Sequence, residues 1–225
     1  MREKILFVLG IAAFLILARD IYVIARLPPE ASQGYVFKII FFHISAWVAA
    51  GATLSTALIT SVLFLITKKF KYDAIAVAST EVGVAFLSMG MVLGSLWARP
   101  VWGIWWTWDA RLTTTAILWL LYLGYLMLRH AIEEPTQRAN FAAVFSIFAF
   151  LDVPIVYFSI RWWRTQHPAP VFFSQNGSFP HDWTVVLDWT ILAVLMFAAL
   201  IVCVRLRQEE DQRELDYLRR LAHAF

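Results

Sequence analysis

The sequence predicts an all-α, polytopic membrane protein with six transmembrane helices and both termini in the cytoplasm. Three observations indicate this class. Of the 225 residues, 60% are hydrophobic and only 16% are charged, which is too apolar a composition for an ordinary soluble domain. Six apolar stretches are each close to or above the roughly 20 residues that a helix needs to cross a bilayer. Lysine and arginine are also distributed unequally between the two sides that these stretches define.

The first two predicted spans each have an irregular feature. The first follows a basic N-terminus that resembles the start of a signal peptide, but no small-residue cleavage site follows, and Arg19 and Asp20 interrupt the apolar run. We therefore interpret it as a span. The second would form a helix of about 46 Å, longer than the hydrocarbon, so one of its ends must project or break. The first three spans are predicted at residues 5–24, 36–66 and 75–97.

The remaining spans carry polar residues whose roles can be purely structural. Asp109 precedes the fourth span and is suited to cap that helix by accepting its free backbone amides. Asp152 and Pro154 predict a kink in the fifth span. Acidic residues within a membrane often mark functional sites, but Glu81 and Asp152 can instead pair between helices, with Arg19 as one candidate partner, so we assign them no site. The fourth, fifth and sixth spans are predicted at residues 111–129, 140–160 and 183–204.

The orientation follows from the count of lysine and arginine residues. With both termini in the cytoplasm, the inner segments hold twelve and the outer segments six, in agreement with the positive-inside rule. The inner set is Arg2, Lys4, Lys68, Lys69, Lys71, Arg129, Arg138, Arg205, Arg207, Arg213, Arg219 and Arg220, and the outer set is Arg26, Lys38, Arg99, Arg111, Arg161 and Arg164. We expect one membrane domain, residues 1–204, with an outer tryptophan-rich loop at 97–113. The cytoplasmic tail, 205–225, is expected to extend the last helix into solvent.

Charge and cysteine content exclude several function classes. The net charge of +3 is small and its positive residues lie at the ends of apolar segments, which argues against nucleic-acid binding. The single cysteine, Cys203, excludes an intramolecular disulfide and a haem-attachment motif with two cysteines. No glycine-rich nucleotide-binding motif is present, so this chain alone cannot hydrolyse ATP.

Tryptophans concentrate in and beside the predicted outer loops, whereas the inner loops contain none. The outer set is Trp97, Trp102, Trp105, Trp106, Trp108, Trp162, Trp163 and Trp183. Aromatic belts normally form at both membrane interfaces, so this one-sided enrichment indicates that the function lies at the outer face. If the loop at 97–113 is helical, Trp102, Trp105 and Trp106 share one stripe, while Trp108 and Arg111 point elsewhere.

Such a stripe would form a flat aromatic platform at the membrane surface. A large planar apolar ligand such as a porphyrin suits this platform, because aromatic side chains bury much area and lose little rotamer entropy. Arg99 and Arg111 flank it and could hold the two carboxylates of haem. Alternatively, the tryptophans anchor the protein in the interface and the arginines face lipid headgroups, and composition favours neither interpretation.

Histidine is the usual axial ligand of haem iron, and the chain contains five. If the second helix reaches the inner interface near Thr67, His43 lies roughly 6 Å beyond the hydrocarbon, in the outer interface. His167 follows the fifth span in a segment that Pro168 holds out of helical geometry. His43 and His167 therefore come to the same side at a similar depth, as two axial ligands of one iron must.

The other three histidines are weaker candidates for different reasons. His130 and His223 fall on the predicted cytoplasmic side and are expected at the surface. His181 shares the third outer loop with His167, so it stays a rival ligand. For any one histidine taken alone, a satisfied interfacial residue is the more common role.

These residues resemble a known family. The segment at 102–113, WGIWWTWDARLT, is similar to the signature of the tryptophan-rich haem-handling (WWD) proteins of cytochrome c maturation. The chain length, the six spans, Phe42-His43 with Trp47 following, and the segment at 154–167 resemble the short members of that group, the haem exporter protein C (CcmC-type) family. The likeness covers nearly the whole chain except the tail.

The resemblance implies a place in the bacterial inner membrane and a function at its periplasmic face. There the protein would bind haem b non-covalently and transiently, and pass it to a haem chaperone that bonds it covalently. The implied partners are an ABC-type ATPase, its membrane subunit and a small single-span subunit. The implied axial ligands are His43 and His167. The other candidate haem contacts are Trp102, Trp105, Trp106, Trp108, Asp109, Arg111 and Arg99.

Three other functions compete with a haem-presenting module that performs no bond chemistry. A cytochrome c haem lyase or synthase shares the tryptophan signature, but it needs more spans and a second, membrane-buried histidine pair. A subunit of an ABC-type transporter could move haem or another substrate across the bilayer. An electron-transfer cytochrome b would favour histidines within the bilayer, whereas His43 and His167 are predicted at its edge.

Overall fold

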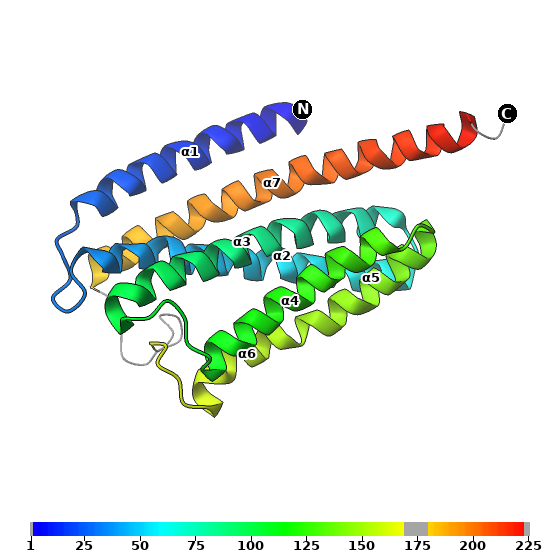
Figure 1. Cartoon of the computed structure of the whole chain (residues 1–225). Coiled ribbons are helices and arrows are strands. Elements are labelled where there is room, and N and C mark those ends of the chain that lie inside the picture. Colours follow the sequence, from blue (N-terminus) through cyan, green and yellow to red (C-terminus); the bar gives the residue numbers. More distant parts are fainter. Residues whose placement is uncertain (1, 169–179, 223–225) are drawn as a thin grey trace.

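The computed structural model describes residues 2–168 and 180–222. Within these residues it contains seven α-helices and one 3₁₀ helix, and the β-type pairing among them is an isolated bridge between Glu30 and Gly34. The helices are α1 (Arg2–Arg26), η1 (Tyr35–Lys38), α2 (Ile39–Thr67), α3 (Phe70–Trp102), α4 (Ala110–Ala131), α5 (Pro135–Phe150), α6 (Asp152–Trp162) and α7 (His181–Ala222). The predicted all-α class is therefore confirmed (Figure 1).

Six helical segments of the described chain are long and apolar enough to cross a membrane, as predicted. They are α1, η1 with α2, α3, α4, α5 with α6, and α7. The long second span changes geometry at its start, where the 3₁₀ turn of η1 precedes α2. The fifth span is interrupted at Leu151, directly before Asp152, which agrees with the predicted kink. The tail continues α7 as a helix as far as Ala222, as predicted, but it does not simply extend into solvent, because Arg213 of the tail donates to the buried Asp73 of α3 at 2.7 Å. Residues 223–225 lie outside the described part.

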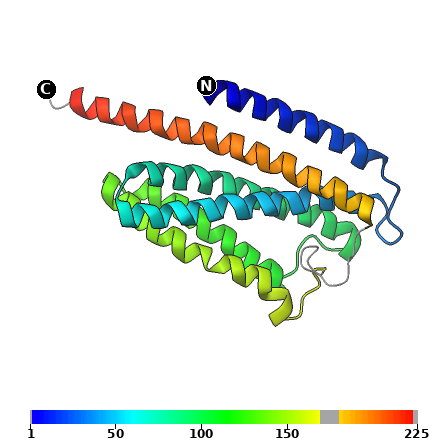
Figure 2. The same ribbon diagram turned by 180° about the vertical axis from the view of Figure 1, so that it is seen from behind.

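The even number of spans brings both termini to one end of the molecule (Figures 1 and 2). We call this end the tail end. The opposite end carries the connections α1–η1, α3–α4 and α6–α7, and we call it the tryptophan end. The tryptophans in or beside these connections are Trp97, Trp102, Trp105, Trp106, Trp108, Trp162, Trp163 and Trp183. The structure thus reproduces the predicted one-sided distribution.

The close packing of α2 against α3 determines where the site lies. α2 carries small buried residues along its length, including Ala46, Ala49, Ala50 and Ala57. A Cβ at Gly83 of α3 would lie 2.6 Å from Leu54 Cδ2 and 3.0 Å from Thr53 Oγ1, so side chains of α2 pack directly against the bare backbone of α3 at this position. Small residues of this kind are typical of helix contacts within membranes, where close approach supplies the stabilisation.

The last helix, α7, lies beside α1 along one side of the molecule (Figures 1 and 2). Beyond the predicted span it is attached to α3 by Arg205, whose Nε donates to Glu81 Oε2 at 2.6 Å. Arg19 instead pairs with its neighbour Asp20 at 2.8 Å. The predicted interhelical pairing of Glu81 is therefore confirmed, but its partner is Arg205 of α7 and not the candidate Arg19 of α1.

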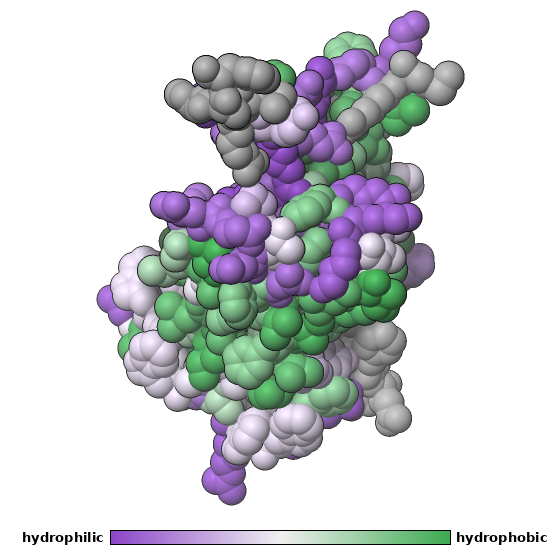
Figure 3. All heavy atoms as spheres, turned by 90° about the vertical axis from the view of Figure 1, so that its right-hand side faces the viewer, coloured by the Kyte–Doolittle hydropathy of each residue, from purple (hydrophilic) through white to green (hydrophobic). Residues whose placement is uncertain are grey.

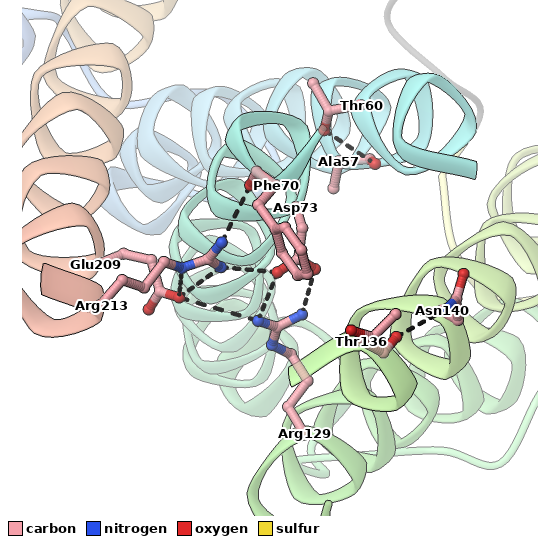
Figure 4. A network of polar contacts seen from close by, with 9 residues as sticks. All are labelled: Ala57, Thr60, Phe70, Asp73, Arg129, Thr136, Asn140, Glu209 and Arg213. Carbon is pink, nitrogen blue, oxygen red and sulfur yellow. Dashed lines mark hydrogen bonds and ion pairs between the residues drawn. The ribbon is translucent and has the colours of Figure 1, made fainter. Parts of the chain in front are cut away.

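A buried ionic cluster joins α3, α4 and α7 near the tail end (Figure 4). Asp73 accepts hydrogen bonds from Arg129, at 2.6 and 3.1 Å, and from Arg213, at 2.7 Å. Arg213 also pairs with Glu209 one turn earlier on α7, at 2.6 Å. Asp73 and Arg129 are almost fully buried.

Seen from the tail end, hydrophilic residues form a band above a largely apolar surface (Figure 3).

Candidate functional site

A cavity at the tryptophan end lies between α2, α3 and α4 and is closed by the segments that follow α3 and α6. Its volume of about 290 Å³ is near the lower end of the range for small-molecule sites. Its walls are mainly apolar and aromatic. Six of the residues that the sequence singled out line it: His43, Trp102, Trp105, Trp106, Arg111 and His167.

His43 reaches the cavity from α2, and contacts on both ring nitrogens define its tautomer. Nδ1 lies 2.9 Å from the carbonyl oxygen of Gly90 on α3. Since a carbonyl can only accept, Nδ1 carries the proton. Nε2 lies 3.2 Å from Nε1 of Trp47, which can only donate, so Nε2 accepts that hydrogen bond. His43 is thus a neutral imidazole whose in-plane lone pair is on Nε2 and accepts the Trp47 N–H.

Two glycines of α3 make room for this pair of rings. A side chain at Gly94 would place its Cβ 2.9 Å from His43 Cε1. A side chain at Gly90 would place its Cβ 3.0 Å from Trp47 Cε2 and Nε1. Because Gly90 and Gly94 are one helical turn apart, α3 presents bare backbone against which the imidazole and the indole pack.

His167 enters the cavity from the non-helical segment that follows α6. Its backbone N–H donates to Thr165 Oγ1 at 3.0 Å, and its Nδ1 donates to the carbonyl oxygen of Pro168 at 2.9 Å. The lone pair is therefore on Nε2, as in His43. Burial lowers the pKa of His167 below its ordinary value, although the Pro168 contact opposes this, so the imidazole is neutral at pH 7.

The tryptophan-rich segment is mostly a loop and not the helix on which the predicted tryptophan stripe depends. α3 ends at Trp102, and Gly103 adopts the left-handed conformation with φ 78° while its N–H donates to the Arg99 carbonyl. Glycine at this position ends helices readily because it has no Cβ to clash. Residues 103–109 are not helical. The prediction that helical spacing aligns the tryptophans and turns Arg111 away is wrong, since Arg111 also lines the cavity.

The tryptophan rings surround the site at several angles and do not form a flat platform. Trp97 and Trp102 meet edge to face at 81°, with centroids 5.1 Å apart. Trp106 and Trp108 meet at 73°, with centroids 5.8 Å apart. Trp102 and Trp106 line the cavity, whereas Trp108 lies outside its described lining and is 76% exposed. These tryptophans therefore contribute walls and a rim to the site.

Asp109 connects the tryptophan-rich loop to the segment that carries His167. Its Oδ1 accepts from the N–H of Leu112 at 2.9 Å, which confirms the predicted cap of α4. Its Oδ2 accepts from Thr165 Oγ1 at 2.6 Å and from the N–H of Gln166 at 3.1 Å. Burial raises the pKa of Asp109, but these hydrogen bonds outweigh burial and hold the pKa below its ordinary value. The carboxylate is thus ionised and positions the loop that holds His167.

The two candidate arginines occupy different places. Arg111 lines the cavity, and its Nη1 donates to the carbonyl oxygens of Val156, at 2.8 Å, and Tyr157, at 3.3 Å, on α6. It thereby ties α4 to α6 beside the site. Arg99 is exposed, lies outside the described lining of the cavity, and places its guanidinium 6.0 Å from the centre of the Trp105 ring. Of the two arginines predicted to flank the platform, Arg111 therefore lines the cavity, while Arg99 lies beside Trp105.

The other polar candidates within the described residues do not line the cavity. His181 begins α7, is exposed, and is not among the described residues that line the site. His130 is exposed at the end of α4, while His223 and residues 169–179 lie outside the described part of the chain. Asp152 is buried at the break between α5 and α6, and its Oδ2 has no hydrogen-bond partner among the described residues.

Several cavity residues were not assigned a role from the sequence. Trp47 was noticed only as part of the family-like pattern, although its position four residues after His43 places both side chains on one face of α2. Gly90 and Gly94 have the same spacing on α3, which is a signal for close contact between helices. Tyr157 also lines the cavity, and no local pattern distinguishes it from other aromatic residues of that span.

Comparison with known proteins gives a consistent result. A family model described as "Heme exporter protein C" matches residues 1–220. A protein of that name from Bradyrhizobium diazoefficiens is 35% identical over 195 residues, which cover 85% of this chain and 74% of the relative. One from Paracoccus denitrificans is 33% identical over 190 residues, covering 84% and 79%. The "Putative cytochrome c biosynthesis ccmC-like mitochondrial protein" of Marchantia polymorpha is 33% identical over 171 residues, covering 76% and 72%.

The family match covers α1 to α6, α7 as far as residue 220, and every residue of the cavity. All three of these relatives exceed 30% identity over more than three quarters of this chain. The chain therefore belongs to the haem exporter protein C family, membrane components of cytochrome c maturation with a haem-handling role.

Proposed function

We propose that this protein binds haem non-covalently at the tryptophan end, with Nε2 of His43 and Nε2 of His167 as the axial ligands of the iron. One observation carries this proposal. The two imidazoles line one cavity from separate parts of the fold, and each donates its Nδ1 proton to a backbone carbonyl. Metal-binding histidines commonly make this second hydrogen bond, which fixes the tautomer and the ring orientation. Imidazole is also the usual protein ligand of haem iron.

The rest of the cavity suits a porphyrin. Trp102, Trp105 and Trp106 supply large apolar surfaces, which favour a planar aromatic ligand. Arg111 is a charged lining residue and the candidate to pair with a haem carboxylate. A porphyrin is large for a cavity of about 290 Å³, so part of it would extend past the rim towards the exposed Trp108.

A partly exposed haem fits a protein that presents its cargo and then releases it. We propose that the protein holds haem b transiently and offers it to a haem chaperone, which forms the covalent bond. An ABC-type ATPase with its membrane subunit and a small single-span subunit would complete the assembly. The chain contains no nucleotide-binding motif, so any ATP-driven step belongs to those partners.

The same proposal places the tryptophan end in the periplasm and the tail end in the cytoplasm of a bacterium. Residues 1–204 then form the membrane domain, and residues 205–225 form the cytoplasmic tail. The distribution of lysine and arginine supports this orientation. A periplasm-active reporter fused after Asn176 should be active, and the same reporter fused after Phe225 should be inactive. The reverse pattern would overturn the orientation.

Haem ligation is tested on the purified full-length protein. Haem content and absorption spectra are compared for the wild type, His43→Ala, His167→Ala and His181→Ala. We expect the first two variants to alter the spectrum and lower the haem content, because each removes an axial ligand. His181→Ala is the matched control and should resemble the wild type. Unchanged spectra for His43→Ala and His167→Ala would overturn the proposed ligation.

A further inference from the structure

The hydrogen bond between Trp47 and His43 conflicts with iron binding at His43. Nδ1 of His43 is protonated and directed at the Gly90 carbonyl, 2.9 Å away, so it cannot bind iron. Nε2 holds the only lone pair of the ring, and that lone pair accepts the Trp47 N–H at 3.2 Å. An imidazole nitrogen has one lone pair in the ring plane. It therefore cannot accept this hydrogen bond and coordinate a metal at the same time.

We propose that Trp47 caps His43 in the haem-free protein and that haem binding displaces the cap. The Trp47 cap is defined as the hydrogen bond from Trp47 Nε1 to His43 Nε2. This inference rests on the proposed ligation by His43 and adds a competitor within the same site. When haem leaves, Trp47 Nε1 again donates its hydrogen bond to His43 Nε2. The cap therefore favours the release of haem and lowers the affinity of the site for haem.

The surroundings of Trp47 are suited to a contact that forms and breaks. The side chain is half-buried and itself lines the cavity, so one side of the indole is not enclosed by the helix interface. The opposite side faces Gly90, where even a Cβ would lie 3.0 Å from the indole. At 3.2 Å the cap is at the long end of the hydrogen-bond range, which makes it a weak competitor that a metal ligand bond can replace.

The first test compares Trp47→Phe with the wild type in the full-length, haem-free protein titrated with haem. Phenylalanine keeps an aromatic ring against Gly90 but has no N–H to donate. We expect haem to bind about 2- to 10-fold more tightly, the change that corresponds to the loss of one competing neutral hydrogen bond, and to dissociate more slowly. Gly90→Ala displaces the indole while keeping its N–H, and an increased affinity is expected for that variant too.

Trp119→Phe is the matched control. Trp119 is also half-buried in the membrane domain, and its Nε1 donates to Ser88 Oγ at 2.8 Å, outside the described lining of the cavity. Its substitution removes an indole hydrogen bond of the same kind, so it should leave haem affinity unchanged. Equal gains in haem affinity in Trp47→Phe and Trp119→Phe would mean that the loss of any indole hydrogen bond in the membrane domain raises the affinity. That result would overturn the cap.

A second measurement reports on the cap without haem. Nitrogen-15 NMR of the histidine side chains should show a protonated Nδ1 for His43 in the wild type, in Trp47→Phe and in Trp119→Phe. The Nε2 resonance should move towards that of a free lone pair in Trp47→Phe and stay in place in Trp119→Phe. Wild-type haem affinity and an unmoved Nε2 resonance in Trp47→Phe would overturn the cap alone. An unchanged haem spectrum in His43→Ala would overturn the ligation itself, and the cap with it.

Discussion

The carboxylate of Asp109 accepts a hydrogen bond from the hydroxyl of Thr165 at 2.6 Å, and Thr165 in turn accepts from the backbone N–H of His167 at 3.0 Å. This chain of contacts connects the tryptophan-rich loop to the second candidate iron ligand. Asp109 also caps α4 through Leu112. One carboxylate therefore stabilises a helix and positions a histidine without lining the cavity.

We expect Asp109→Ala to weaken haem binding roughly 10-fold, because loss of an outer-shell contact misplaces the ligand that it orients. The variant should also lose about 1 kcal/mol of stability through the missing helix cap. Glu134→Ala is the matched control, since Glu134 caps α5 through Thr136 and Gln137 at the other end of the molecule. It should lose similar stability but bind haem normally.

Thr165→Val separates the two roles of Asp109. This variant keeps the cap of α4 and removes the hydroxyl that bridges Asp109 and His167. Haem titration should show weakened binding with little change in melting temperature. If Thr165→Val binds haem as the wild type does while Asp109→Ala does not, Asp109 acts through the cap or through the N–H of Gln166, and not through the Thr165 hydroxyl.

We expect Gly94→Ala to displace the imidazole of His43, because the new Cβ would lie 2.9 Å from Cε1. The haem spectrum should change and the affinity should fall, while the helix itself gains slightly from replacing glycine by alanine. Gly51→Ala on α2 is the control, since its Cβ would meet no atom within 4 Å. A normal haem spectrum and affinity in Gly94→Ala would contradict this prediction, because the His43 imidazole could then move away from the new Cβ and still bind haem.

The ionic cluster near the tail end should contribute strongly to stability. Asp73→Ala leaves Arg129 and Arg213 without the buried carboxylate that they share, and loss of one member of a buried ion pair costs about 3 kcal/mol or more. Thermal unfolding in detergent should show a much lower melting temperature. Arg219→Ala, which loses an exposed contact of 3.5 Å with Asp216, should melt near the wild type. Equal melting temperatures would contradict a stabilising role for Asp73.

The lowered pKa of His167 predicts a defined response to acid. A histidine whose folded-state pKa lies below its value of 6.5 in the unfolded chain binds fewer protons when folded, so acidification below about pH 6.5 destabilises the fold. The imidazole should also stay neutral and able to bind iron to a lower pH than a free histidine. NMR titration of His167 in the haem-free protein checks this, and a midpoint at or above 6.5 would contradict it.

The fold was largely predictable because membrane spans follow from apolar length and the positions of the histidines follow from span ends. His43 and His167 line one cavity because His43 lies four residues after the start of α2 and His167 lies five residues beyond the end of α6 at Trp162, at the same end of the molecule. Contacts between distant segments were not predictable in this way. No local pattern indicates that Asp109 meets Thr165 or that Glu81 meets Arg205, since these pairs depend on how the helices pack.

The error in the tryptophan-rich loop has a specific physical cause. Glycine directly after a helical run favours the left-handed conformation that ends a helix, and Gly103 adopts it, so helical spacing does not continue past Trp102. Trp105 and Trp106 still line the cavity together with Trp102, because they lie in the connection between α3 and α4, which both contribute lining residues. The path of this loop, and not helical periodicity, therefore places the three tryptophans at one cavity.

Electron–nuclear double resonance of the ferric haem complex, prepared with nitrogen-15 histidine, counts the histidine nitrogens that are bound to the iron. The wild type should show strong coupling to two histidine nitrogens. His43→Ala and His167→Ala should each retain one, and His181→Ala should retain both. Two strongly coupled nitrogens in either His43→Ala or His167→Ala, or none in the wild type, would overturn ligation of one haem iron by His43 and His167.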